Sequence, residues 1–219
     1  MYKGIVLYCS HALPVILPSL PCCRIMSEGG SRGDVAMRAN DNVHRSGITP
    51  EEMAAGYDEW SENYEKMMIW KGGYRGPAIT LEEALRWVPP ERRAKARVLD
   101  VAAGTGCVGR ELHREGFRHI DAVDPSEGMM KQRETGIYTN DFLEFIGSGH
   151  STVPKGGFVI IVMRHEFLQT VPSYKDKLEP YMDQLEADGK WKKVERRIVP
   201  NYFCDKEGLV FVFRITKPE

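Results

Sequence analysis

Residues 98–106 read VLDVAAGTG, and this stretch decides the fold. It is a short apolar run that ends at a glycine turn, and Val108 and Leu112 follow it at helical spacing, so a strand leads directly into a helix. A second apolar run, residues 119–124, ends in an aspartate. Strand, helix and strand in this order form a βαβ unit, in which the two strands lie parallel in one sheet.

Three further segments complete the predicted sheet. The run 158–163 is apolar throughout, which is typical of a strand buried on both faces of a parallel sheet. The runs 193–199 and 209–215 follow each other without a helical pattern between them, so they should pair antiparallel as a hairpin. We therefore predict an α/β protein with a Rossmann-like, mostly parallel sheet, helices on both faces and a C-terminal antiparallel hairpin.

Capping signals and apolar spacing predict the helices. Segments 49–52 and 80–83 each combine a threonine with a glutamate three residues later, which is the pattern of a capping box at the start of a helix. A third helix is predicted over 174–187, where apolar residues recur on one stripe and Pro180 marks a kink or a restart.

The middle of the chain is short for this fold. Only residues 125–157 separate the second strand from the strand at 158, whereas a single βαβ unit takes about 30 residues. One strand-helix unit is therefore expected to be missing. The run 141–147 is the single strand-like segment left there. It could be the third strand, with Asp141 or Glu144 near a bound ligand, or the fourth strand, whose end would carry a substrate loop.

The amino-terminal region differs in composition from the rest. Residues 1–26 hold no acidic residue, and their apolar stretch is interrupted by His11 and two prolines, which does not match a signal peptide. The following segment is rich in Gly, Ser, Arg, Asp and Asn and has few large apolar groups. We predict that residues 1–47 are a disordered extension and linker and that 48–219 form the folded domain.

Composition limits the class of partner. Lys and Arg number 30 against 31 Asp and Glu, so no excess of positive charge predicts binding to nucleic acid or to an anionic membrane. The five cysteines form no CxxC pair and no metal-ligand spacing with the histidines, so we expect reduced thiols, a cytoplasmic location and no metal. A small molecule is the expected substrate, and the oligomeric state does not follow from the sequence.

The glycine turn and the aspartate that ends the second strand predict a nucleotide site. Backbone N–H groups at the start of the helix and glycines that allow close approach suit such a ligand, and Asp124 can accept hydrogen bonds from both ribose hydroxyls. Residues 104–109 also satisfy the dinucleotide pattern GxGxxG, so an NAD-dependent enzyme is an alternative. Asp100 argues against it, because an acid there would repel a pyrophosphate but attract the ammonium and sulfonium of S-adenosylmethionine.

These motifs together resemble the class I S-adenosylmethionine-dependent methyltransferases. Residues 98–106 are similar to the family's first motif and 124–126 to its ribose motif, and the likeness covers about residues 50–219. Within the family, the sequence resembles in particular the methyltransferase-like protein of the Williams–Beuren syndrome chromosomal region, on patterns at 57–64, 136–138 and 191–194. Ala102 departs from the family, which usually has a glycine there.

The expected cofactor is S-adenosylmethionine, and several residues are predicted to hold it. They are Asp100, Ala102, Gly104, Thr105, Gly106, Asp124, Pro125, Met129, Tyr57 and Tyr64. The two tyrosines could form a lid over the methionine end or simply pack in the core, and Met129 could contact adenine or fill a core gap.

The predicted function is S-adenosylmethionine-dependent methyl transfer to a small-molecule acceptor. No catalytic residue is assigned, although His165 could be a general base or lie in a solvated loop. The alternative is a catalytically inactive binding or regulatory protein, because the shortened middle could leave the adenine wall or the acceptor wall incomplete.

Overall fold

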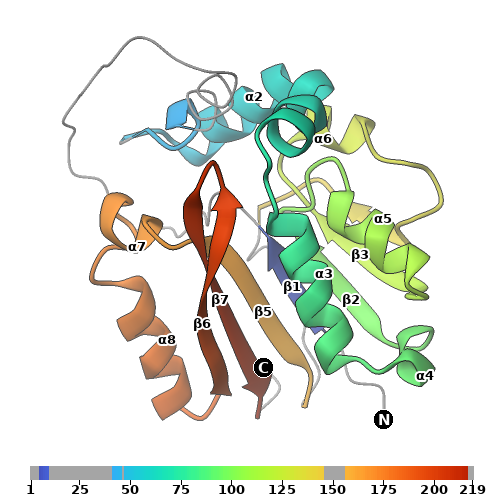
Figure 1. The fold of residues 1–219 in the computed structure, drawn as a ribbon, viewed down its shortest axis with the longest axis vertical. Helices are drawn as coiled ribbons and strands as arrows, with labels where there is room; N and C mark the ends of the chain where they lie inside the picture. Colours follow the sequence, from blue (N-terminus) through green and yellow to red (C-terminus); the bar gives the residue numbers. More distant parts are fainter. Residues whose placement is uncertain (1–4, 10–40, 46, 146–155, 217–219) are drawn as a thin grey trace.

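The protein folds around one seven-stranded sheet (Figure 1). The computed structural model describes residues 5–9, 41–45, 47–145 and 156–216. The strands are β1 (Ile5–Cys9), β2 (Arg97–Val101), β3 (His119–Val123), β4 (Asn140–Phe142), β5 (Phe158–Arg164), β6 (Trp191–Phe203) and β7 (Lys206–Ile215). Their order across the sheet is β4-β3-β2-β1-β5-β7-β6.

Strands β1 to β5 are parallel, and β7 pairs antiparallel with both β5 and β6. The predicted parallel sheet with a closing antiparallel hairpin is therefore confirmed. The hairpin turns at Cys204 and Asp205, both of which have positive φ angles (45° and 62°), so the connection is far shorter than the sequence pattern suggested.

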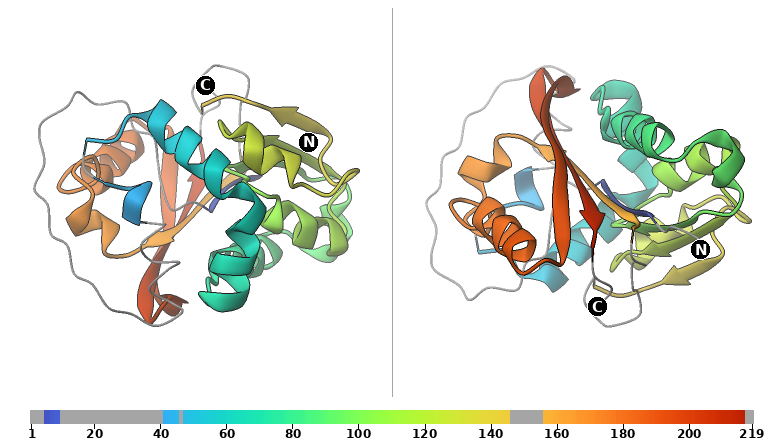
Figure 2. Two further views of the ribbon diagram at one scale, coloured as in Figure 1. Left: turned by 90° about the horizontal axis from the view of Figure 1, so that it is seen from above. Right: turned by 90° about the horizontal axis from the view of Figure 1, so that it is seen from below.

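Helices lie on both faces of the sheet (Figure 2). They are α2 (Pro50–Trp60), α3 (Gly76–Trp87), α4 (Pro90–Arg93), α5 (Cys107–Arg114), α6 (Glu127–Lys131), α7 (Phe167–Thr170) and α8 (Leu178–Ala187), with a 3₁₀ turn at Ser61–Asn63 and a π-helical turn at Lys66–Lys71. Helices α3 and α5 pack in one apolar cluster, and α7 and α8 contribute to a second cluster.

Of the two predicted capping boxes, the structure contains one. The capping box at Thr49 is present, because its hydroxyl accepts from the Glu52 amide while the Glu52 carboxylate accepts from the Thr49 amide. The box predicted at Thr80 is wrong: α3 already begins at Gly76, and the Thr80 hydroxyl donates to the Gly76 carbonyl inside the helix.

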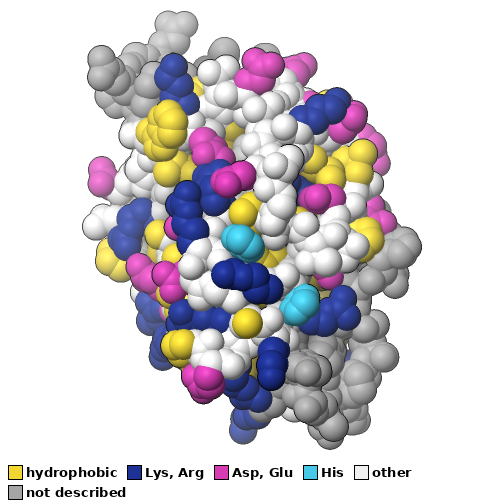
Figure 3. Space-filling model, turned by 90° about the vertical axis from the view of Figure 1, so that its right-hand side faces the viewer, with side chains coloured by type: hydrophobic (Ala, Val, Ile, Leu, Met, Phe, Trp, Pro, Cys, Tyr) yellow, Lys and Arg dark blue, Asp and Glu magenta, His cyan; other side chains and the backbone are white. Residues whose placement is uncertain are grey.

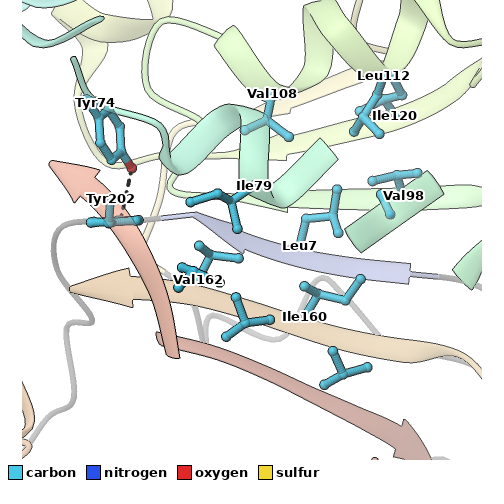
Figure 4. Close-up of a cluster of buried hydrophobic side chains, with 14 of the residues drawn as sticks. Leu7, Tyr74, Ile79, Val98, Val108, Leu112, Ile120, Ile160, Val162 and Tyr202 are labelled. Atoms are coloured by element: carbon cyan, nitrogen blue, oxygen red, sulfur yellow. Dashed lines mark hydrogen bonds between the residues drawn. The ribbon is translucent and has the colours of Figure 1, made fainter. Parts of the chain in front are cut away.

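The amino-terminal prediction is wrong for residues 5–9. Strand β1 lies in the middle of the sheet, parallel to both β2 and β5, and the Leu7 side chain is fully buried with Val98 and Ile160 (Figure 4). An apolar pentapeptide can pair on both sides here because no strand from the described middle of the chain lies between β2 and β5. Residues 1–4, 10–40 and 46 of the predicted extension lie outside the described residues, whereas Val43, in the described stretch 41–45, is buried.

The middle of the chain supplies one strand to the described structure. Strand β4 pairs only with β3 and forms one edge of the sheet, so the run around Asp141 is the third strand and not the fourth. The place that the missing strand-helix unit would have filled is taken by β1, which brings the sheet to seven strands.

Candidate functional site

The turn between β2 and α5 forms the floor of the candidate site. Its backbone is left-handed at Ala102, Gly104 and Gly106, with φ angles of 54°, 54° and 83°. A Cβ atom added to Gly104 would meet no atom within 4 Å, so open space faces the backbone there. Ala102 adopts the same left-handed region with a side chain, which costs energy that a glycine would not.

The other two glycines of the GxGxxG pattern serve a different purpose. A Cβ added to Gly109 would lie 2.3 Å from the Tyr138 hydroxyl oxygen, and one added to Gly106 would lie 3.1 Å from the same ring. These glycines therefore make room for Tyr138 to pack against the start of α5. The third glycine is therefore explained by the packing of an internal side chain.

Asp100 is a buried carboxylate beneath this turn. It is 1% exposed, and the Tyr138 hydroxyl donates to its Oδ2 at 2.8 Å. Burial raises the pKa of Asp100 to about 6, although the hydrogen bond from Tyr138 and the charge of Arg133 both act to lower it. The backbone amide of Gly109 also acts to lower the pKa of Asp100. Even so, no N–H or O–H group of the described residues forms a hydrogen bond of good geometry with Oδ1 of Asp100.

Asp124 follows β3 and faces the same turn. Its Oδ2 accepts from the Gly104 amide at 2.7 Å and its Oδ1 from the Ser126 amide at 2.9 Å. Burial raises the pKa of Asp124 from its ordinary value, and these two amides oppose that effect. A carboxylate offers about four lone-pair positions, so two remain for a ligand.

Arg133 joins these parts and was missed by sequence reasoning. Its Nε donates to the Gly104 carbonyl at 2.8 Å, its guanidinium lies 5.1 Å from the centre of the Tyr138 ring, and it forms an ion pair with Asp141. The pairing occupies Asp141, for which a ligand contact was considered. Terminal nitrogen Nη2 of Arg133 is buried and has no hydrogen-bond partner among the described residues.

The segment from α2 to the π-helical turn lies across the carboxyl ends of β2 and β3 (Figures 1 and 2). The Glu65 carboxylate accepts from both terminal nitrogens of Arg110, at 3.0 and 3.3 Å. Arg110 lies in the first turn of α5, next to Cys107, whose pKa burial raises to about 12. Cys107 is thus a structural thiol, and Thr105 contacts its sulfur at 3.4 Å.

Tyr57 and Tyr64 belong to an aromatic cluster in this segment. Tyr57 stacks on Trp60 with ring centres 6.1 Å apart, and Tyr64 packs edge-on against Trp60 at 5.2 Å. The pKa of Tyr57 is raised far above its ordinary value, first by burial of its hydroxyl and then by the charge of Asp124. The Tyr57 hydroxyl therefore lies near the carboxylate that ends β3.

The chain is similar in sequence and in fold to known methyltransferases. No family model matches the sequence. The human methyltransferase-like protein 27 is 30% identical over 165 residues, which cover 62% of this chain and 66% of that protein, just under two thirds of its length. Over these residues the chain is therefore similar to a methyltransferase-like protein.

Solved structures of methyltransferases share the fold. The Burkholderia thailandensis 1,6-didemethyltoxoflavin-N1-methyltransferase, solved with 1,6-didemethyltoxoflavin and S-adenosylhomocysteine, matches at a TM-score of 0.50 and 17% identity, covering 78% of this chain and 92% of that one. A chain from the complex of the Haloferax volcanii Trm112 methyltransferase activator with a candidate methyltransferase also matches at 0.50, with 12% identity and 74% and 98% coverage.

Some of the predicted cofactor-binding residues lie at the open turn, and the others pack nearby. Asp100, Ala102, Gly104 and Asp124 surround the open turn, and Gly106 begins α5 beside it. Thr105 points its side chain toward Cys107. Pro125 is half-buried next to Asp124, and Met129 is 2% exposed in α6, as expected of a core residue.

Other residues lie outside this group. His165 follows β5 and contacts the Glu207 carboxylate at 3.2 Å, and nothing among the described residues links it to the glycine turn. Sequence reasoning missed the partners that complete the site, although Tyr138 and Asp58 stand within the patterns 136–138 and 57–64 that indicated the family.

Proposed function

We propose that this protein binds S-adenosylmethionine at the glycine turn and transfers its methyl group to a small-molecule acceptor. The observation that supports this best is the placement of two buried carboxylates beside the open backbone at Gly104: Asp100 lies on β2, and Asp124 directly follows the neighbouring parallel strand β3. An acidic, phosphate-repelling site of this kind suits a ligand that carries a ribose and positive charges.

The residues present fit the cofactor. The free space at Gly104 allows a ligand to approach the backbone closely, as a bulkier residue would not. One oxygen of Asp100 has no hydrogen-bond donor among the described residues, and an ammonium group would satisfy it, while Asp124 has lone pairs left for ribose hydroxyls. The bound cofactor would supply a methyl group that is activated by its positive sulfur.

The chain's own contribution is to bind and align. Asp124 is held by two backbone amides and Asp100 by the Tyr138 hydroxyl, so both carboxylates are fixed before a ligand arrives. Such fixed geometry supplies much of the acceleration in a displacement that needs the nucleophile and the methyl group in line. His165 stays a candidate general base because it follows β5 at the same edge of the sheet.

The acceptor is proposed to be a small molecule and not a nucleic acid. Formal net charge is −1. Lys and Arg side chains lie among acidic ones on the face shown in Figure 3. Several arginines of the described residues are in ion pairs, including Arg93 with Glu115 and Arg114 with Glu111. No helix in the described ranges has the length and apolarity to cross a bilayer. A cytoplasmic location and membership of the Williams–Beuren region group remain part of the proposal, and the similarity to a methyltransferase-like human protein supports the second.

Calorimetric titration of S-adenosylmethionine and S-adenosylhomocysteine into the full chain tests the proposal. Asp124→Ala should abolish micromolar binding, whereas Asp121→Ala, in the middle of the preceding strand and paired with Arg97, should not change it. A folded wild-type protein that binds neither ligand would overturn the proposal and favour the inactive binding or regulatory protein.

A further inference from the structure

The Asp58 side chain of helix α2 contacts the start of α6, next to the candidate site. Its Oδ1 accepts from the Ser126 hydroxyl at 2.6 Å and from the Gly128 amide at 2.7 Å. A Cβ added to Gly128 would lie 2.9 Å from the Asp58 Cα, so the backbone of α2 rests directly against α6. The contact therefore requires both an acceptor oxygen at position 58 of α2 and a glycine at position 128 of α6.

The same hydrogen bonds continue to the glycine turn. Ser126 donates its backbone amide to Asp124, and Asp124 in turn accepts from the Gly104 amide. One connected chain of hydrogen bonds thus runs from α2 to the backbone that would face the ligand. Movement of α2 away from α6 would leave the Ser126 hydroxyl and the Gly128 amide without their acceptor.

A second contact holds the same segment further along. The Glu65 carboxylate pairs with Arg110 in the first turn of α5, as described above, so the segment is fixed to both helices that follow the two ligand-facing strands. Tyr64 lies between the two anchors, and Tyr57, whose pKa is raised in part by the charge of Asp124, directly precedes the first anchor. The segment can cover the site only while its anchors hold.

We propose that Asp58 is a positioning residue which couples closure of helix α2 over the site to binding of the cofactor, through Ser126 and Asp124. This inference rests on the proposed function. Coupling of this kind is reciprocal: whatever factor the closed helix adds to cofactor affinity, the cofactor adds to the stability of the closed helix. Asp58 itself needs no contact with the cofactor.

The test measures both sides of this coupling with S-adenosylhomocysteine as the probe. Asp58→Ala should weaken its binding about tenfold, the size expected when hydrogen bonds to a charged group are lost. The protection that S-adenosylhomocysteine gives to the α2 amides in hydrogen–deuterium exchange should fall by a similar factor. Asp58→Asn keeps an acceptor oxygen in place and should stay within about threefold of wild type.

Glu59→Ala is the matched control, because Glu59 is the exposed neighbour on the same helix and should change neither readout. Should Asp58→Ala fail to fold, Gly128→Ala, which forces α2 away from α6, should give the same paired losses. Unchanged affinity and unchanged α2 protection in these variants would overturn the inference while leaving the proposed function intact. Failure of the wild type to bind at all would overturn both.

Discussion

Replacing Leu7 by alanine tests the least expected feature of this fold, the central position of β1. Leu7 is 0% exposed and packs in the main core cluster, and its Cα is paired with that of Asp100 on β2. Truncating a fully buried leucine removes its transfer free energy and leaves a cavity, at a typical cost of about 2–5 kcal/mol. Because β1 is fixed between two strands that cannot easily close the gap, we expect a loss of about 3 kcal/mol or more.

Urea unfolding followed by tryptophan fluorescence and circular dichroism measures this loss. Val6→Ala is the control, since Val6 is the next residue on the opposite face and is only half-buried; its truncation should cost about 1 kcal/mol or less. If Leu7→Ala unfolds within about 0.5 kcal/mol of wild type, Leu7 is not in the core, and the placement of β1 between β2 and β5 is refuted.

Three further substitutions probe the site. Asp100→Asn should stabilise the protein at pH 7 by up to about 3 kcal/mol. The reason is that the folded protein raises the pKa of Asp100 from 3.8 to about 6, so the wild type loses stability as pH rises between about 4 and 6. Urea unfolding of both proteins at pH 4 and at pH 7 measures the difference. The same variant should weaken S-adenosylhomocysteine binding in calorimetry. Ala102→Gly should raise the free energy of unfolding by about 1 kcal/mol, because the φ angle of 54° suits glycine, and thermal unfolding would show it. Gly109→Ala should cost about 1–3 kcal/mol in urea unfolding through its clash with Tyr138.

The outcomes that would contradict these expectations are specific. A wild-type protein and Asp100→Asn that differ equally at pH 4 and pH 7 would show that Asp100 is not a buried, titrating carboxylate. A destabilising Ala102→Gly would mean that the methyl group packs better than the backbone is strained. Gly109→Ala should lose much of its cost when combined with Tyr138→Ala, and full additivity of the two would place Tyr138 away from α5.

Local patterns were sufficient for much of the fold. The strands at 97–101, 119–123 and 158–164, the hairpin and the capped start of α2 each depend on residues a few positions apart, and all were predicted. The box at Thr80 misled because capping residues also occur inside a helix whose start is set by tertiary packing, here at Gly76. The third-strand position of 140–142 followed only from its pairing with β3.

The sequence by itself determined the βαβ unit, the glycine turn and the two carboxylates, because strand period, helix period and turn chemistry act over short distances. Only the tertiary structure decided which segment fills the gap between β2 and β5. The sequence of an apolar pentapeptide does not specify its partner strand, because any free strand edge can pair with it. The same holds for Tyr138 on Asp100 and Asp58 on Ser126. Tyr138 and Asp100 are 38 positions apart in the sequence, and Asp58 and Ser126 are 68 positions apart. These pairs form because, once the sheet and helices have packed, the remaining space and unsatisfied polar groups bring their side chains together.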